Sequence, residues 1–161
     1  MNDYRVAIVG ATGLVGQEFS KMLLERHFPM ASLRLMASDR SAGRKIQAGD
    51  KEIVVEETTP ESFEDIDIAL FSAGAEQSKH FAPIAAKSGA AVIDNSSAWR
   101  MEKDVPLVVP EVNPGDIRHH KGIIANPNCS TIQMVVALYP LHKVNPIKRV
   151  IADTYQSVSG V

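Results

Sequence analysis

The sequence has little cysteine, little net charge and no long hydrophobic run. Its 161 residues include a single cysteine, Cys129, which excludes an intrachain disulfide. The formal net charge of -2 gives no general attraction to nucleic acid or anionic lipid. No apolar run approaches the roughly 20 residues that span a bilayer, and no basic and then apolar leader precedes the first strand pattern. These absences favour a cytoplasmic protein that binds neither nucleic acid nor membrane.

The composition that is present is that of a globular domain. Hydrophobic residues make up 45% and charged residues 22% of the chain, whose length fits one domain with its own core. Strand-like patterns cover 5–9, 33–37, 53–56, 67–71, 90–94 and 147–154, short apolar runs 107–109 and 123–125, and helical patterns 14–26, 76–87 and 130–142. Alternating strands and helices predict an α/β fold with a mostly parallel sheet.

Three glycines follow the first predicted strand in the spacing G-x-x-G-x-x-G. Gly10 permits the sharp turn off the strand, Gly13 permits a phosphate to approach the backbone, and Gly16 permits the helix to pack on the sheet. The first N–H groups of the following helix then meet a pyrophosphate. The pattern is a variant of the tighter G-x-G-x-x-G spacing. It predicts a dinucleotide site and a Rossmann-like, doubly wound sheet with helices on both faces.

The segment after the second predicted strand indicates which dinucleotide is bound. An acidic residue near this point holds the ribose hydroxyls in NAD enzymes, and Asp39 lies slightly late for that role. Arg40 and Ser41, with Arg44 and Lys45 close by, suit a 2′-phosphate, because a guanidinium can bind phosphate oxygens in a bidentate manner. We therefore expect NADP rather than NAD, with Asp39 as the contrary indication.

The one cysteine lies in a polar segment rich in turn residues. Pro127 ends an extended stretch and the helical pattern begins just after Cys129. A helix N-terminus favours the thiolate over the thiol and so supports a nucleophile that forms a covalent intermediate. The alternative is a small core residue, and the sequence alone leaves both open. None of the five histidines has metal-ligand spacing, so no metal site is expected.

Seven segments together resemble the aspartate-β-semialdehyde dehydrogenase family. They are GATGLVG at 10–16, RSAG at 40–43, SAG at 72–74, DNSSAWRM at 94–101, VPEVN at 109–113, NPNCST at 126–131 and QSVSG at 156–160. The resemblance implies reversible, NADPH-dependent reduction of the small molecule β-aspartyl phosphate to aspartate semialdehyde and phosphate. This step leads to lysine, threonine, methionine and, in bacteria, diaminopimelate.

The resemblance also implies a role for each matching residue. Cys129 would form the acyl thioester, Gln156 would orient the substrate, and Arg100 and Asn128 would bind the substrate and its phosphate. The remaining matches would bind NADP: Gly10, Thr12, Gly13, Leu14 and Val15 at the pyrophosphate, Arg40 and Ser41 at the 2′-phosphate, Ser72 and Gly74 along the groove, and Ser159 and Gly160 at the nicotinamide.

The chain departs from the family by being much shorter. The resemblance implies that residues 1–161 are the N-terminal, NADP-binding domain of a longer enzyme, itself a homodimer or larger. The other half would carry the histidine acid–base, so this chain alone is expected to be inactive. One alternative is an N-acetyl-γ-glutamyl-phosphate reductase, whose cysteine flank reads more like Pro-Gly-Cys-Tyr-Pro-Thr than Asn128-Cys129-Ser130-Thr131. Another is a noncatalytic dinucleotide-binding module.

Overall fold

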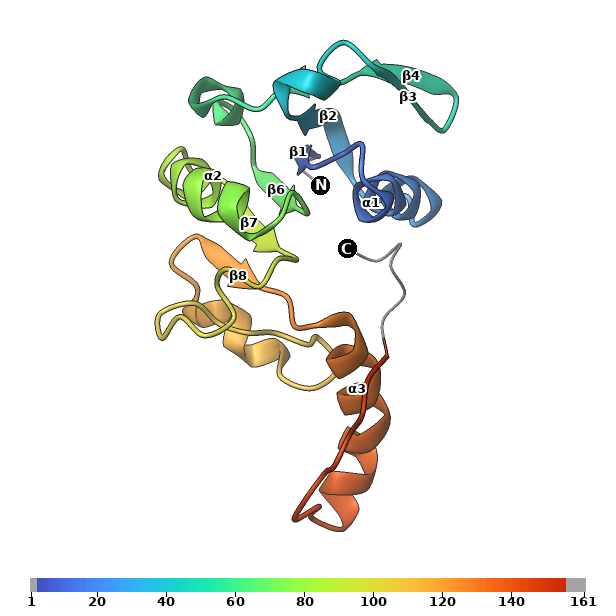
Figure 1. The fold of residues 1–161 in the computed structure, drawn as a ribbon, viewed down its shortest axis with the longest axis vertical. Coiled ribbons are helices and arrows are strands. Elements are labelled where there is room, and N and C mark those ends of the chain that lie inside the picture. Colours follow the sequence, from blue (N-terminus) through green and yellow to red (C-terminus); the bar gives the residue numbers. More distant parts are fainter. Residues whose placement is uncertain (1–2, 156–161) are drawn as a thin grey trace.

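A computed structural model describes residues 3–155 as an α/β fold built on one parallel sheet (Figure 1). The strand order is β5-β2-β1-β6-β7-β8. These strands are β1 Tyr4–Val9, β2 Met30–Ala37, β5 Glu56–Glu57, β6 Ile68–Phe71, β7 Ala91–Asp94 and β8 Ile123–Ala125. The helices are α1 Leu14–Glu25, α2 Ala75–Lys87 and α3 Cys129–Val144, with 3-10 turns η1 Asp39–Ser41, η2 Pro60–Phe63 and η3 Pro114–His119. The predicted mostly parallel α/β fold is confirmed.

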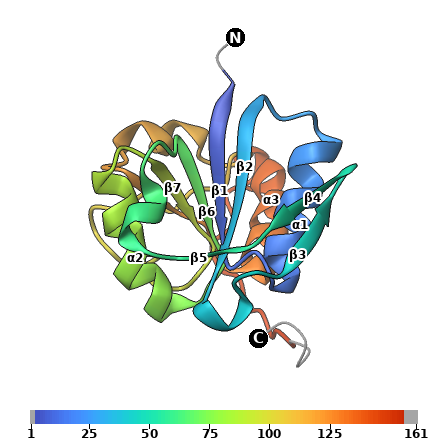
Figure 2. The same cartoon turned by 90° about the horizontal axis from the view of Figure 1, so that it is seen from above.

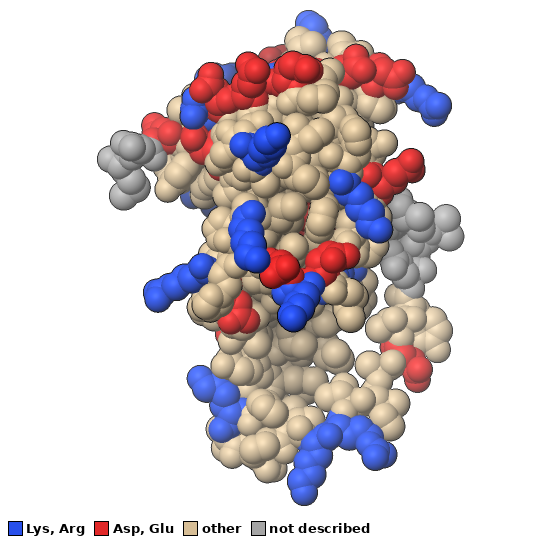
Figure 3. Space-filling model, turned by 90° about the vertical axis from the view of Figure 1, so that its left-hand side faces the viewer, with Lys and Arg blue, Asp and Glu red and all other residues tan. Residues whose placement is uncertain are grey.

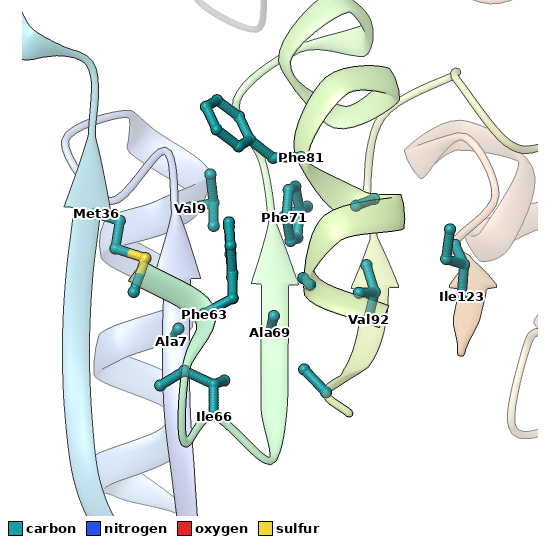
Figure 4. Close-up of a cluster of buried hydrophobic side chains, with 13 residues drawn as sticks. Ala7, Val9, Met36, Phe63, Ile66, Ala69, Phe71, Phe81, Val92 and Ile123 are labelled. Carbon is teal, nitrogen blue, oxygen red and sulfur yellow. The ribbon is translucent and has the colours of Figure 1, made fainter. Parts of the chain in front are cut away.

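Both faces of the central strand β1 are buried, because successive side chains of a strand point to opposite faces. Ile8 belongs to a core cluster that packs against α1 through Phe19. Ala7 and Val9 belong to a second cluster, on the α2 side (Figure 4). Helices therefore cover both faces of the sheet, as predicted, and Figure 2 shows α1 and α2 on opposite sides of the strands.

Three phenylalanines form the aromatic part of the α2-side core. The Phe63 ring stacks on Phe71 with centroids 5.9 Å apart, and the Phe81 ring lies 6.0 Å away from Phe63. These rings come from η2, β6 and α2, three consecutive elements of the chain. Their burial attaches α2 to the sheet beside the carboxyl end of β6, where the functional site lies.

An antiparallel hairpin interrupts the parallel pattern and was not predicted from the sequence. It consists of β3 Lys45–Ala48 and β4 Lys51–Val54, joined by a turn at Gly49, where φ is +62°. The expected strand 53–56 is divided at the buried Val55 between this hairpin and β5. The division arises because the Val55 N–H donates to Arg44 (2.7 Å), whereas the residues after it pair with β2.

The expected strand at 147–154 was wrong, since these residues form no regular structure. A strand needs an open edge, and the outer edge of β8 is already occupied. The Ala125 N–H donates to the Pro106 carbonyl (2.9 Å), and the Val108 N–H donates to the Ala125 carbonyl (3.0 Å). Val150 and Ile151 are consequently exposed despite their strand-like character.

Helix α3 extends away from the sheet (Figure 1). None of its side chains is buried. It is nonetheless an apolar helix, with exposed side chains that include Leu141 and Val144. Within residues 3–155, no helix is long and apolar enough to cross a membrane.

Candidate dinucleotide and substrate site

The strand order reverses at β1, and this creates a groove at one edge of the sheet. The chain moves from β1 to β2 on one side and later places β6 on the other side of β1. The loops that leave β1 and β6 therefore separate at the carboxyl edge, where ligands bind in open α/β sheets. A groove of about 630 Å³ lies there, lined among others by Gly10, Thr12, Gly13, Ser38, Asp39, Thr58, Ser72, Ala73, Gly74 and Gln77.

Gly10 and Gly16 have no room for a side chain. Gly10 has φ of +88°, and a Cβ there would overlap the Ser72 carbonyl oxygen and lie 2.7 Å from its carbon. A Cβ on Gly16 would overlap the Gly10 carbonyl oxygen and lie 2.7 Å from the Ala11 Cα. Gly10 therefore makes the tight turn that the glycine spacing predicts, whereas the close contact of Gly16 is with the loop at Gly10 and Ala11 and not with the strands themselves.

The beginning of α1 has donors available for an anion. Gly13 is the N-cap residue and makes no side-chain cap, so the first N–H groups of the helix receive no acceptor from the cap. The amide nitrogen of Gln17 holds the loop by donating to the Thr12 carbonyl (3.0 Å). Leu14 and Val15 are exposed in the first turn. Uncapped N–H groups beside a groove fit a pyrophosphate.

The adenosine end of the groove gives a mixed picture. Ser38 and Asp39 line the groove at the end of β2. Arg40 and Ser41 follow in the same turn, η1, but are not among the residues that line the groove. The geometry therefore places Asp39 at the groove and leaves Arg40 exposed beside it. It is compatible with NAD and, if the Arg40 side chain swings toward the groove, with NADP.

Cys129 is the first residue of α3 and is exposed at the same edge of the sheet. Asn128 caps the helix, since its side-chain oxygen accepts from the N–H groups of Ser130 (3.0 Å) and Thr131 (3.3 Å). This cap places the thiol at the end of the helix where the backbone N–H groups point. It also leaves Asn128 only its amide N–H bonds as donors to a substrate.

Arg100 is held beside the loop that leads to Cys129. Its Nε donates to the Asn126 carbonyl and its Nη2 donates to the Asn95 carbonyl, both at 3.0 Å. The two asparagines are joined by their side chains, Asn126 Nδ2 to Asn95 Oδ1 at 2.6 Å. The half-buried guanidinium thus bridges the segments that follow β7 and β8, with N–H bonds remaining for an anion.

Residues 5–120 match the family described as semialdehyde dehydrogenase, NAD binding domain. The chain belongs to this family. Its fold, groove and glycine loop agree with a nicotinamide dinucleotide-binding domain.

Members of the semialdehyde dehydrogenase family with longer chains share this architecture. A curated relative from Aquifex aeolicus, named aspartate-semialdehyde dehydrogenase, is 62% identical over 98% of this chain and 47% of its own. The structure of aspartate semialdehyde dehydrogenase II from Vibrio cholerae, complexed with ASA, has a TM-score of 0.85 and 49% identity over 88% of this chain and 48% of that chain. The Candida albicans enzyme with NADP has a TM-score of 0.76 and 33% identity, covering 91% and 48%. The chain spans about half the length of these relatives.

Three of the site residues expected from the sequence lie outside the described residues: Gln156, Ser159 and Gly160. Sequence reasoning missed Asn95 and Asn126, whose role appears only when β7 and β8 are side by side. Sequence reasoning also missed Trp99, whose Nε1 donates to Ser78 Oγ (2.9 Å). In the part of this semialdehyde dehydrogenase family chain that the structure describes, no group of three His, Cys, Asp or Glu side chains could hold a metal.

Proposed function

We propose that this chain is the N-terminal, NADP-binding domain of an aspartate-semialdehyde dehydrogenase. The observation that carries the proposal is the pairing of Arg100 with the loop that leads to Cys129, through the Asn126 carbonyl. An exposed thiol and an arginine with free donors at one edge of the sheet suit attack on an acyl phosphate. We also propose that the product, aspartate semialdehyde, is a precursor of lysine, threonine, methionine and, in bacteria, diaminopimelate.

The proposed chemistry begins when Cys129 Sγ attacks the acyl carbon of β-aspartyl phosphate. The bond from this carbon to the phosphate oxygen breaks, leaving an acyl thioester on Cys129 and free phosphate. Within the described residues, two of the five N–H bonds of Arg100 bind main-chain carbonyls, and we propose that the other three donate to the phosphoryl oxygens. The dinucleotide, when bound, supplies the hydride that reduces the thioester to the aldehyde.

The rest of the longer enzyme is proposed to supply the acid–base group and the oligomer contacts. We place Gln156 near the substrate, and Ser159 and Gly160 near the nicotinamide, as the family resemblance implies. The single free cysteine is compatible with a reducing compartment, and we place the enzyme in the cytoplasm. Figure 3 shows charges of both signs interspersed on the face it presents, without a broad basic patch, which supports a small-molecule substrate rather than nucleic acid.

The activity can be tested in a chimera in which this chain replaces the aligned half of the Aquifex aeolicus relative. We expect phosphate-dependent reduction of NADP with aspartate semialdehyde, followed by NADPH absorbance. C129S should lower the rate roughly a thousandfold or more, whereas S88A, at an exposed serine that ends α2, should not change it. Activity only with N-acetylglutamate semialdehyde would support the rival reductase, and binding without turnover would support a noncatalytic module.

The preference for NADP is tested separately, by titrating the chain with NADPH and NADH. Replacing Arg40 with alanine should weaken NADPH binding about tenfold, because the 2′-phosphate loses a charge-assisted partner, and should leave NADH binding unchanged. Arg26, exposed at the end of α1, provides the matched control R26A. Equal effects on both nucleotides would instead support Asp39 and NAD.

A further inference from the structure

Asp94 carries a buried carboxylate that the proposed chemistry does not use. It is the last residue of β7 and is 0% exposed, and no other ionisable side chain among the described residues is buried. None of the ion pairs found within residues 3–155 includes it. Burying a carboxylate without partners is energetically unfavourable. Its hydrogen bonds therefore indicate what it does.

The two carboxylate oxygens of Asp94 accept from two different hydroxyl groups. Oδ1 accepts from Ser78 Oγ of α2 (2.8 Å), and Oδ2 accepts from Ser96 Oγ of the following loop (2.7 Å). Because each serine uses its O–H toward the carboxylate, its oxygen can only accept from other groups. The direction of every further hydrogen bond is thereby determined.

Both serine oxygens accept hydrogen bonds from the residues just before Arg100. Ser96 Oγ accepts from the Ala98 N–H (3.1 Å), and Ser78 Oγ accepts from the Trp99 indole Nε1–H (2.9 Å). Two chains of hydrogen bonds therefore run from the loop to one buried carboxylate. A shift of the loop would break these hydrogen bonds and leave their donors or acceptors unpaired, which is unfavourable in a part-buried position.

We propose that Asp94 is a positioning residue that sets Arg100 for phosphate binding by fixing residues 96–99. The inference rests on the proposed function, since it takes Arg100 as the phosphate-binding group. Among the described residues, the Asp94 side chain hydrogen-bonds to Ser78 and Ser96 and not to Arg100, so it acts on Arg100 through the loop. Asparagine at this position keeps the shape but offers one acceptor oxygen and an N–H₂ group, so one serine hydroxyl would lose its acceptor.

The first test uses the chain itself, because Trp99 is its single tryptophan. The indole N–H gives one NMR signal, whose hydrogen exchange reports on the bond to Ser78. D94N should accelerate this exchange about tenfold, the equivalent of one hydrogen bond, although Asp94 does not touch Trp99. D104N should not accelerate the exchange, since Asp104 is exposed and paired with Lys121.

S78A serves as a second variant in case D94N does not fold. Unchanged exchange in D94N, or in S78A if D94N is unfolded, would overturn the proposal.

The second test uses the chimera and separates the two proposals. R100K and D94N should each raise the KM for phosphate roughly tenfold or more, because a small displacement of a binding group costs that much, while the KM for the dinucleotide stays unchanged. If R100K leaves the phosphate KM unaltered, the proposed role of Arg100 fails, and this inference with it. If R100K raises it and D94N does not, only the positioning role of Asp94 is wrong.

Discussion

At Gly10 two constraints act together on one residue. The backbone has φ of +88°, a region that residues with a Cβ rarely adopt, and the loop after β6 occupies the space that a Cβ would need. Gly89, at the end of α2, has φ of +101° but nothing within 4 Å of its Cβ position. A substitution at Gly89 therefore introduces backbone strain alone, whereas one at Gly10 introduces backbone strain and steric overlap.

Replacing Gly10 with alanine is expected to cost more stability than replacing Gly89. G89A introduces only a strained backbone, worth about 1 kcal/mol in the free energy of unfolding. G10A adds overlap with the Ser72 carbonyl, so we expect a loss of about 3 kcal/mol or more together with loss of dinucleotide binding. Urea unfolding and NADPH titration measure the two effects. Equal costs for both variants would show that the Ser72 contact is unimportant.

How far the sequence predicted the site also depends on the residue. The roles of Gly10 and Gly16 follow from spacing, because a turn and a helix contact are local. Asp94 carried no such signal, since its partner Ser78 lies sixteen residues earlier, on another element. Hydrogen bonds between separate elements depend on the order of the strands in the sheet. Neither composition nor periodicity predicts that order.

At the scale of elements, one ion-pair network ties the start of β1 to the start of β6. The Arg5 guanidinium donates to both oxygens of Asp67 (3.1 and 2.9 Å) and to Asp65 (2.8 Å), and the Arg5 N–H donates to Asp67 as well (2.7 Å). The side-chain bonds, followed by the backbone bond, lower the pKa of Asp67 from 3.8 to about 2. Asp67 in turn raises the pKa of Arg5.

This shift predicts a specific loss of stability in acid. A carboxyl group whose pKa is lowered by folding stabilises the fold above its unfolded pKa and loses that contribution as the pH falls through its folded pKa. The loss should therefore develop between about pH 4 and pH 2. Melting temperatures measured across this range should fall less steeply for D67N than for the unaltered chain. D104N, at an exposed ion pair, is the control, and identical curves for D67N would contradict the prediction.

Replacing a side chain with alanine should lower the free energy of unfolding far more in the aromatic core than at the end of α3. Phe63 is fully buried between Phe71 and Phe81, so F63A should cost about 3–5 kcal/mol through lost burial and a cavity. Leu141 is 62% exposed, so L141A should change the free energy of unfolding by no more than about 0.5 kcal/mol. Urea denaturation of both variants provides the comparison. A large cost for L141A would mean that α3 is packed in solution.

Periodicity predicted the long elements and failed where pairing decides the structure. Helices α1 and α2 and strands β1 and β6 lie within a few residues of the expected ranges, because their patterns are regular. The segment 147–154 has strand-like character but finds the edge of β8 occupied. Strand character describes which residues tolerate pairing, whereas a strand forms only if a partner edge is available.

For the whole molecule, we expect the chain alone to bind the dinucleotide without catalysing the reaction. The groove, the glycine loop and the uncapped start of α1 all lie within the described residues, whereas relatives are about twice as long. The chain alone should therefore bind NADPH but give no detectable reduction of β-aspartyl phosphate. Fluorescence titration and an absorbance assay of the same sample test this. Turnover by the chain alone would show that one half suffices.

The difference between the two helix beginnings has a thermodynamic consequence. Asn128 caps α3 from within the chain, whereas Gly13 supplies no cap for α1. A dinucleotide phosphate bound at the start of α1 would accept from the N–H groups that Gly13 leaves uncapped. Part of the binding free energy would therefore increase the free energy of unfolding. By mass action, a ligand at a hundred times its Kd adds about 2.7 kcal/mol to the stability of the fold that binds it. The chain should therefore melt at a higher temperature in the presence of its cofactor, with the largest gain in hydrogen-exchange protection in the first turn of α1.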